Sequence, residues 1–373
     1  MNQPDQYQIT PLEMAVVLMS MITGVGILTI PRSLTSALET PDGWISIIIA
    51  GIIFMFIVYL FVKLQQQIPG QTVFTYLEQG KIGKWFAFIL TLGFAIYFIS
   101  LLAFEARILA LVAKMYLLDQ TPSEALVAII LLTTTYAVTK GVQGVVHLCL
   151  MFTPIILLLG FVMLLANLPN VEFERMLPIM GEGITPVLLG LSEISLSFLG
   201  VELLLFLMVY MNKSKVRALP FNLSIGLITI SYVLTFMVVV SIFGVNGSQI
   251  VTFPTVEAVK EVEVPGAFFE RLESLMITIW IMTIFNTMTV AQLLLVHLLK
   301  DKLMTKKKKL VLPVVVFLTY LIAFIPNSIA DLFMMGDWLG YLGVGLIFFS
   351  LVVGFLTIFF RKKKIVTQDA KGV

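Results

Sequence analysis

The sequence contains few charged residues. Asp, Glu, Lys and Arg make up 12% of its 373 residues, about half of the roughly 25% that is usual in soluble domains. Apolar residues make up 59% of the chain, and the mean hydropathy is +1.02. This balance excludes a soluble globular protein and indicates an all-α protein that crosses the membrane several times.

Cysteine, histidine and catalytic motifs are also scarce. The chain has one cysteine, Cys149, and two histidines, His147 and His297. One cysteine excludes an internal disulfide, and these three residues do not make an ordinary zinc cage. The patterns HExxH, GxSxG and GxxxxGK(S/T) are absent from the sequence. We therefore expect no enzyme, no metal or other cofactor, and no nucleic-acid partner.

Long apolar runs are abundant instead. A helix that crosses a bilayer needs about 20 apolar residues. Because no basic region precedes the first run and no cleavage site follows it, we expect this run to be retained as a signal anchor. The expected transmembrane helices are ten, near 12–37, 43–64, 85–117, 124–140, 145–167, 186–210, 218–243, 273–299, 310–327 and 338–360.

Lysine and arginine indicate the orientation. If the N-terminus is cytoplasmic, the inner loops and the C-terminal end hold 18 of the 24 basic residues, as the positive-inside rule requires. We therefore expect both termini on the cytoplasmic side. The basic runs 213–217 and 305–309 are expected to act as topology signals that contact lipid headgroups, with a partner surface as the alternative.

The chain is expected to form one integral membrane domain over residues 1–373. Its last residues, 361–373, are expected to form a charged cytoplasmic tail. The outer segment 244–272 is acidic and half amphipathic. It is expected to form a short surface helix, with a cap over the site or a subunit contact as alternatives.

Two runs contain residues that weaken a helix at mid-span. Gly24 and Gly26 lie at the midpoint of the first run, and the stretch SLSFLGVE, residues 195–202, lies at that of the sixth. Glycines that serve helix packing favour a spacing of four, whereas these two glycines are two apart. We therefore expect non-helical backbone near 23–26 and 198–201, with packing alone as the alternative.

The two weak segments open two five-span halves, near 12–167 and 186–360. Because five is odd, the second half enters the membrane from the opposite side, which makes an inverted repeat. Breaks at matching positions of such repeats mark the binding sites of transporters. The first break points helix N-terminal amides into the site, and the sixth presents carbonyls. These groups suit a carboxylate and an ammonium, so we expect a small zwitterion such as an amino acid.

Six short motifs resemble those of a known family. Together they resemble the multi-span B subunit of spore germinant receptors, in the amino acid–polyamine–organocation transporter superfamily. The resemblance covers about residues 10–345. The motifs are GVGILTIPRSL (24–34), TPDGW (40–44), FEAR (104–107), LPIMGEG (177–183), SFLGVE (197–202) and FERLES (269–274).

The resemblance implies a fold, a location and a role. It implies the LeuT-like five-plus-five fold with broken helices 1 and 6, and a ligand site between spans 1, 3, 6 and 8. It also implies the spore inner membrane, partnership with germinant receptor A and C subunits, and the sensing of a small-molecule germinant rather than bulk uptake.

Residues of these four spans form the expected ligand site. The backbone amides of 23–26 are expected to bind the carboxylate, and Tyr97 and Thr287 to make polar contacts. For Tyr97, Thr283 and Thr287 the alternative is a hydrogen bond to a neighbouring helix. The expected set is Thr23, Gly24, Val25, Gly26, Tyr97, Leu101, Phe198, Leu199, Gly200, Thr283 and Thr287.

Four charged residues lie deep within the expected spans, away from the span ends: Glu105, Arg107, Glu193 and Glu202. Charges inside a membrane are costly and usually paired. Glu105 and Arg107 are two apart and face different directions on a helix, while depth counting places Glu193 beside Arg107. The expected roles are structural ion pairs or, alternatively, a gate or proton site.

Two classes of function are compatible with such a site. The first is a sensor subunit that binds a nutrient and triggers spore germination. The second is a proton- or sodium-coupled amino-acid permease that works alone. The sequence does not separate them, because both use the same pocket, and it does not identify the nutrient, the passage of ions or the stoichiometry.

Overall fold

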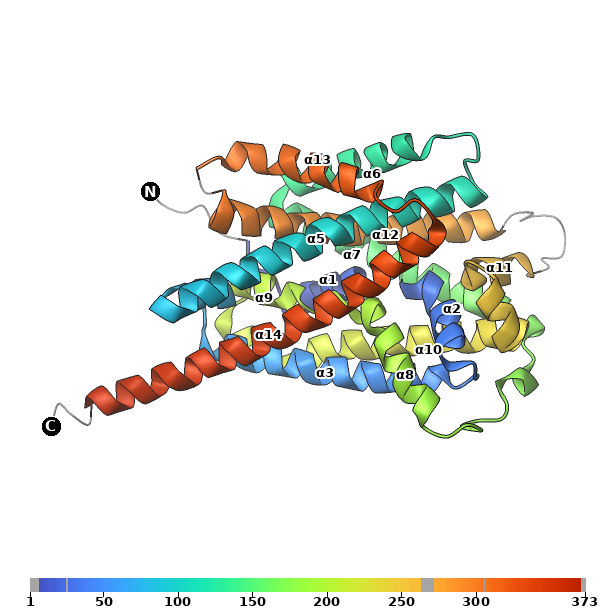
Figure 1. Cartoon of the computed structure of the whole chain (residues 1–373), viewed down its shortest axis with the longest axis horizontal. Helices are drawn as coiled ribbons and strands as arrows, with labels where there is room; N and C mark the ends of the chain where they lie inside the picture. The colour runs from blue at the N-terminus through green and yellow to red at the C-terminus, as the bar shows by residue number, and fades with distance from the viewer. Residues whose placement is uncertain (1–6, 25, 263–271, 305, 370–373) are drawn as a thin grey trace.

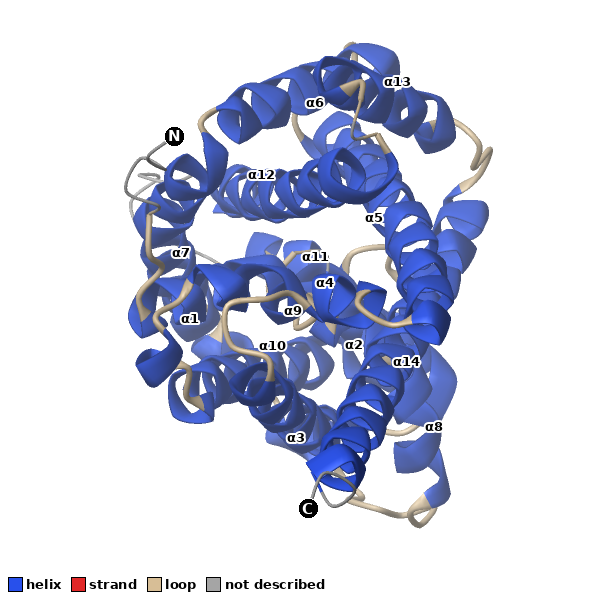
Figure 2. Ribbon diagram, turned by 90° about the vertical axis from the view of Figure 1, so that its left-hand side faces the viewer, coloured by secondary structure: helices blue, strands red, loops and turns tan. Residues whose placement is uncertain are grey.

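The chain is helical almost throughout (Figures 1 and 2). The computed structural model describes residues 7–24, 26–262, 272–304 and 306–369. Within these ranges, β-structure is limited to one isolated bridge between Ile9 and Met211. The α-helices are α1 (Pro11–Ile22), α2 (Gly26–Leu38), α3 (Gly43–Gln67), α4 (Val73–Glu78), α5 (Lys81–Tyr116), α6 (Ser123–Thr139), α7 (Gly141–Ala166), α8 (Thr185–Glu193), α9 (Leu203–Leu207), α10 (Ala218–Ile250), α11 (Pro254–Lys260), α12 (Leu272–Leu298), α13 (Val311–Ala323) and α14 (Ile329–Asp369).

Short turns of other helix types connect these elements. The 3₁₀ turns are η1 (Leu168–Asn170), η2 (Phe173–Met176), η3 (Ser195–Phe198), η4 (Met208–Tyr210), η5 (Lys213–Lys215) and η7 (Lys308–Leu310), and η6 (Leu299–Leu303) is a π turn. The beginning of the expected tail, residues 361–369, continues α14 as helix.

Six helices in the described ranges are long and apolar enough to cross a membrane: α3, α5, α7, α10, α12 and α14. Counting α1 with α2, and α8 with its continuation to Tyr210, as one bent span each gives up to eight. α6 has 17 residues and α13 has 13, and they occupy the expected runs 124–140 and 310–327. Each of the ten expected runs therefore corresponds to a helix or a bent pair.

The first span is broken where Gly24 predicted it. α1 ends at Ile22, α2 begins at Gly26, and the two helices differ in direction by 51°. Pro31 lies inside α2, where it cannot donate the hydrogen bond that the carbonyl of Ile27 would otherwise accept. The Thr255 hydroxyl donates to that carbonyl instead, at 3.0 Å. Side-chain donors of this kind allow a broken helix to persist in lipid.

The sixth span is broken at the expected stretch as well. α8 and the segment from η3 to η4 differ in direction by 57°. Leu199 is extended (φ −63°, ψ 149°), and Gly200 has φ +123°. Glycine adopts this conformation without steric cost because it has no Cβ. The left-handed geometry therefore falls on Gly200, and Gly24 and Gly26 are not among the residues with positive φ in the described chain.

The first broken span packs against helices from both halves of the chain. α12 packs against α5, α6 and α7, and α10 packs against α1, α2 and α3. α1 contacts α7, α10 and α12, while α2 contacts α8, α10 and α11. The two breaks are thus surrounded by helices far apart in the sequence.

The loops that the charge count assigns to the inner side meet at one end of the bundle. The amide of Ile9 donates to the carbonyl of Tyr210 at 3.0 Å. Lys302 forms an ion pair with Glu78 at 2.6 Å, and Arg361 donates to the Tyr76 carbonyl at 2.7 Å. The loops therefore share one face, as alternate crossings require.

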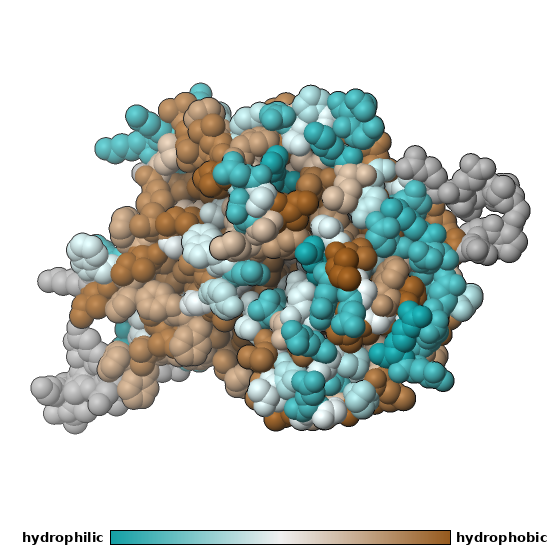
Figure 3. Space-filling model, turned by 45° about the vertical axis from the view of Figure 1, so that its right-hand side comes forward, coloured by the Kyte–Doolittle hydropathy of each residue, from teal (hydrophilic) through white to brown (hydrophobic). Residues whose placement is uncertain are grey.

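The loops assigned to the outer side meet at the other end. Asp42 accepts a hydrogen bond from the amide of Met180 at 2.8 Å, and the Asn170 side chain donates to the Glu261 carbonyl at 2.9 Å. Hydrophilic residues gather at the right of the view in Figure 3, and hydrophobic residues cover much of the left flank. The expected short helix in segment 244–272 is α11; residues 263–271 of that segment lie outside the described ranges.

Candidate ligand site at the two helix breaks

The two helix breaks lie against each other and are joined by Tyr232 of α10. Its hydroxyl lies 2.8 Å from the carbonyl oxygen of Ile22 and 3.2 Å from that of Ser197, and donates toward both. Ile22 ends α1 and Ser197 lies in η3, so one buried side chain contacts the free carbonyl groups of both breaks. A carbonyl without a donor is costly inside a membrane, and the single hydroxyl proton of Tyr232, shared between these two carbonyls, lowers that cost.

Two glycines allow this close contact. A methyl group on Gly26 would lie 2.8 Å from Cβ of Ser197, and one on Gly200 would lie 2.9 Å from Cγ of Met21. Both distances are too short for real side chains, so the breaks require glycine here for space. Packing is therefore part of the role of Gly26, alongside the break that it helps to form.

A small central cavity lies beside the breaks. Its volume is about 20 Å³, which is room for one water molecule. In this conformation of the protein the cavity is therefore too small for a molecule the size of an amino acid. The walls come from the four spans that the resemblance implied and consist of Met21, Ile22, Gly24, Gly26, Tyr97, Leu101, Phe104, Glu105, Leu196, Leu199 and Thr287.

Glu105 is the charged residue in the wall of this cavity. Its side chain is 2% exposed, and Oε2 has no hydrogen-bond partner among the described residues. A methyl group on Gly24 would lie 3.0 Å from Glu105 Oε1 and 3.2 Å from Thr287 Oγ1. The carboxyl group therefore lies at the first break, beside the Thr287 hydroxyl, with an oxygen that can accept a further hydrogen bond.

Glu202 is also buried, but each of its carboxyl oxygens accepts a hydrogen bond from the protein. Oε1 accepts a hydrogen bond from the Tyr97 hydroxyl at 2.9 Å, and Oε2 accepts one from the amide of Gly200 at 2.7 Å. Glu202 also precedes the first residue of α9, where a negative charge is favoured by the helix dipole. These contacts hold the turn of the sixth span in place and match the structural alternative for Tyr97.

The threonines are divided between two cavities. Thr287 lines the central cavity and donates to the Ser20 carbonyl at 3.2 Å. Thr23 and Thr283 line a different cavity, between α7, α10, α11 and α12. The Thr23 amide, which was expected to bind a carboxylate, donates to the Met19 carbonyl at 3.0 Å in this conformation.

Several expected residues do not reach the central cavity. Phe198 is stacked on Phe54 with ring centres 5.2 Å apart, and Gly200 packs against α1. Val25 lies outside the described residues. The structure brings together Gly24, Gly26, Tyr97, Leu101, Glu105, Leu199 and Thr287.

The expected ion pair between Glu193 and Arg107 is not formed. Within the described residues, neither side chain takes part in an ion pair. The guanidinium of Arg107 lies 5.0 Å from the ring centre of Phe324 instead, a cation–π contact that satisfies the charge in part. Depth along a helix does not specify the direction of a side chain, which is why the pairing failed.

Some residues of the site were missed by sequence reasoning. Met21, Ile22, Phe104 and Leu196 line the cavity, but an apolar residue in an apolar run gives no signal. Tyr232 did give a signal in the sequence, because a hydroxyl group deep in a transmembrane helix needs a hydrogen-bond partner. The described residues contain no group of three or more His, Cys, Asp or Glu side chains able to hold a metal ion.

Comparison with known proteins identifies the family. The family model described as "Spore germination protein" matches residues 8–332. This chain belongs to the spore germination protein family. Spore germination protein YndE of Bacillus subtilis (strain 168) is 30% identical over 341 residues, which cover 90% of this chain and 92% of the relative. Spore germination protein A2 of the same organism is 30% identical over 347 residues, covering 92% and 93%.

Solved structures show the fold of this spore germination protein. A Na⁺-coupled sialic acid symporter in a substrate-bound outward-open state is similar at a TM-score of 0.71 and 13% identity, covering 95% of this chain and 81% of that one. MhsT in complex with L-phenylalanine is similar at 0.65 and 14%, covering 92% and 89%. The fold is therefore LeuT-like, with broken first and sixth helices, and the chain is a multi-pass membrane protein.

Proposed function

We propose that this protein is the nutrient-sensing membrane subunit of a spore germinant receptor. It binds a small germinant, an amino acid in the first instance, at the central cavity between the broken first span, α5, the broken sixth span and α12. Binding triggers germination through A and C subunits in the inner membrane of the spore, with both termini of this chain on the core side. The membership of the family supports this role.

The observation that carries the proposal is the unpartnered oxygen of Glu105. A carboxylate buried to 2% exposure inside a membrane protein requires a counter-charge or a proton. The α-ammonium of an amino acid supplies both charge and donors. We assign this role to Glu105 and not to the Ser197 carbonyl of the sixth span, because the Tyr232 hydroxyl lies 3.2 Å from that carbonyl and donates toward it.

The carboxylate of the ligand has a separate partner. α2 begins at Gly26 and contains 13 residues, so its first amides carry the positive end of a helix dipole toward the break. Thr287 Oγ1 lies on the same side as Glu105. A zwitterion can therefore lie between Glu105 and the start of α2, with its side chain toward Leu101, Leu199 and Phe104.

The small volume of the central cavity gives the proposal a mechanism. An amino acid is several times larger than the 20 Å³ present. Binding therefore requires the walls to separate, and the ligand favours whichever conformation holds it. We infer that this widening at the two breaks is the signal that passes to the other subunits, and that the inverted repeat of 12–167 and 186–360 is the moving framework.

The test is ligand binding by purified protein in nanodiscs, screened over amino acids and sugars. Glu105→Gln keeps the shape and removes the charge, so the affinity for an amino acid should fall at least tenfold, which is about 1.4 kcal/mol. Glu193→Gln, on α8 and outside the central cavity, is the matched control and should bind normally. If the Glu105→Gln variant bound the amino acid as tightly as the wild type does, Glu105 would not be the ammonium site.

A second candidate is an ion-coupled amino-acid permease, favoured by the similarity in fold to a Na⁺-coupled symporter. The two functions differ in turnover. Liposomes that contain this chain alone should accumulate labelled amino acid if it is a permease. A sensor should bind the amino acid without accumulation, and spores that lack it should lose the germination response while retaining uptake.

A further inference from the structure

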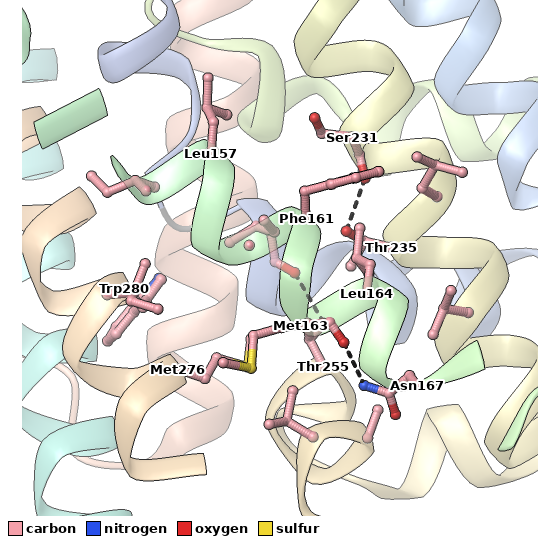
Figure 4. Close-up of a pocket in the computed structure, with 18 of the residues that line it drawn as sticks. Leu157, Phe161, Met163, Leu164, Asn167, Ser231, Thr235, Thr255, Met276 and Trp280 are labelled. Atoms are coloured by element: carbon pink, nitrogen blue, oxygen red, sulfur yellow. Dashed lines mark hydrogen bonds between the residues drawn. The ribbon is translucent and has the colours of Figure 1, made fainter. Parts of the chain in front are cut away.

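A second cavity lies beside the first helix break, and Glu105 is not among the residues that line it. We call it the lateral cavity, and its volume is about 90 Å³. Figure 4 shows Met276 and Trp280 of α12 on one side, Ser231 and Thr235 of α10 on the other, and Phe161, Met163 and Leu164 of α7 between them. The central site does not use these residues.

The lateral cavity opens toward the lipid-facing surface. Phe161 of α7 is 50% exposed and Leu234 of α10 is 37% exposed, and both line the cavity. Their neighbours Leu158 and Ile230 are also exposed, as expected for helices that face hydrocarbon. An apolar molecule dissolved in the bilayer therefore has direct access between α7 and α10.

Two polar atoms in the wall lack partners. Trp280 is 2% exposed, and its indole N–H finds no acceptor within the part of the chain that the structure describes. Asn167 is also 2% exposed; its amide nitrogen donates to the Met163 carbonyl at 3.0 Å, and Oδ1 is left over. In Figure 4 the indole nitrogen lies on the edge of Trp280 that faces α7. A buried donor without an acceptor is unfavourable. A ligand that brings an acceptor therefore forms a hydrogen bond without breaking one that the protein already has.

We propose that the lateral cavity binds a small apolar molecule that carries one hydrogen-bond acceptor, with the acceptor on the indole N–H of Trp280. The volume of about 90 Å³ is below the roughly 150 Å³ of a dry cavity that binds the six carbon atoms of benzene, so the part of the ligand inside has on the order of four heavy atoms. Lipid acyl chains match the apolar wall but bring no acceptor to this depth.

The position of the cavity links it to the broken span. Its wall includes Thr23 and Ile27, on either side of the first break, and Thr255 of α11. Thr255 also donates to the Ile27 carbonyl. An occupant therefore contacts both half-helices and the hydrogen bond that fixes the start of α2.

The experiment compares two ligands of nearly equal shape, cyclopentanone and cyclopentane. Their binding to protein in nanodiscs is measured by saturation-transfer NMR, with empty nanodiscs subtracted. The ketone should bind about tenfold more tightly than the hydrocarbon. Trp280→Phe should remove this preference and leave cyclopentane unchanged, while Trp85→Phe, at an exposed position on α5, should alter neither.

Gly160 provides the blocking variant. It lines the lateral cavity, and no described atom lies within 4 Å of a methyl group built on it. A Cβ at position 160 therefore has open space, so Gly160→Leu is expected to occupy the cavity and abolish binding of both ligands, with Gly160→Ala giving a partial loss. Equal binding of ketone and hydrocarbon to the wild type, or binding retained in Gly160→Leu, would overturn the proposal. Neither outcome depends on the identity of the germinant.

Discussion

The hydroxyl of Tyr97 donates a hydrogen bond to Glu202 Oε1 at 2.9 Å, and both side chains are fully buried. They are 105 residues apart in the sequence and join α5 to the turn of the sixth span. The other Glu202 oxygen holds the amide of Gly200. The Glu202 carboxyl group is therefore held by two hydrogen bonds within the protein, whereas Oε2 of Glu105 has none among the described residues.

Removal of the Tyr97 hydroxyl should therefore act on the sixth-span turn. Tyr97→Phe leaves Glu202 with one donor fewer, which costs about 1–3 kcal/mol. We expect a lower unfolding temperature of purified protein and a germinant dose response shifted to higher concentration. Tyr320→Phe, at a partly buried position, is the control. An unchanged unfolding temperature together with an unchanged dose response would show that the contact has no energetic role.

The two glycines of the first break should respond differently to alanine. In Gly26→Ala the added methyl lies 2.8 Å from Cβ of Ser197 and 3.0 Å from the Tyr232 hydroxyl, so the amount of protein in the membrane should fall, and Ser197→Gly should restore part of it. In Gly24→Ala the methyl meets Glu105 and Thr287, so the protein level should be normal and the nutrient response weakened. Western blots and germination assays on the same spores measure both. Loss of response in proportion to level for both variants would assign both glycines to packing.

Thr287 should affect the ligand through its hydroxyl. Thr287→Val keeps the shape and removes the donor to the Ser20 carbonyl beside the central cavity. The germinant concentration needed should rise about tenfold for each 1.4 kcal/mol lost. Thr289→Val is the control. Both hydroxyls donate to a carbonyl of their own helix, Thr287 to Thr283 at 3.1 Å and Thr289 to Phe285 at 2.7 Å, but Thr289 does not line the cavity. Equal dose responses for the two variants would assign Thr287 to helix packing alone.

The orientation can be tested by cysteine labelling. The single native cysteine, Cys149, is buried, so it should react slowly with a membrane-impermeant maleimide. Lys308→Cys and Glu174→Cys place exposed thiols at opposite ends of the bundle. The first should be labelled in inside-out vesicles and the second in right-side-out vesicles. The reverse pattern would place the termini outside.

The hydrogen bond from α11 to the first helix break should affect the nutrient response. The Thr255 hydroxyl replaces the donor that Pro31 lacks at the Ile27 carbonyl. Thr255→Val should loosen the start of α2 and change the nutrient dose response with little change in protein level, while Thr255→Ser should behave like wild type. Hydrogen–deuterium exchange over residues 26–33 should be faster in the valine variant. Unchanged exchange would show that the bond does not hold the helix.

The sequence by itself determined the spans, their breaks and the family. Hydropathy is a local property, and a bilayer forces each apolar run of sufficient length into a helix because the backbone finds no other partners there. Gly24, Gly26 and the stretch 195–202 weaken their helices wherever these helices pack, so the breaks could be predicted without contacts.

Only the tertiary structure decided which side chains meet. A charge two residues along a helix points in another direction, and its partner lies on a different helix whose rotation the sequence does not state. Glu202 therefore found Tyr97, Arg107 found Phe324, and Glu193 did not reach Arg107. Tyr232 bridged two breaks that are far apart in the chain. Glu105 was left unpartnered at the first break because the packing of α5 against α12 turned it toward Gly24 and Thr287.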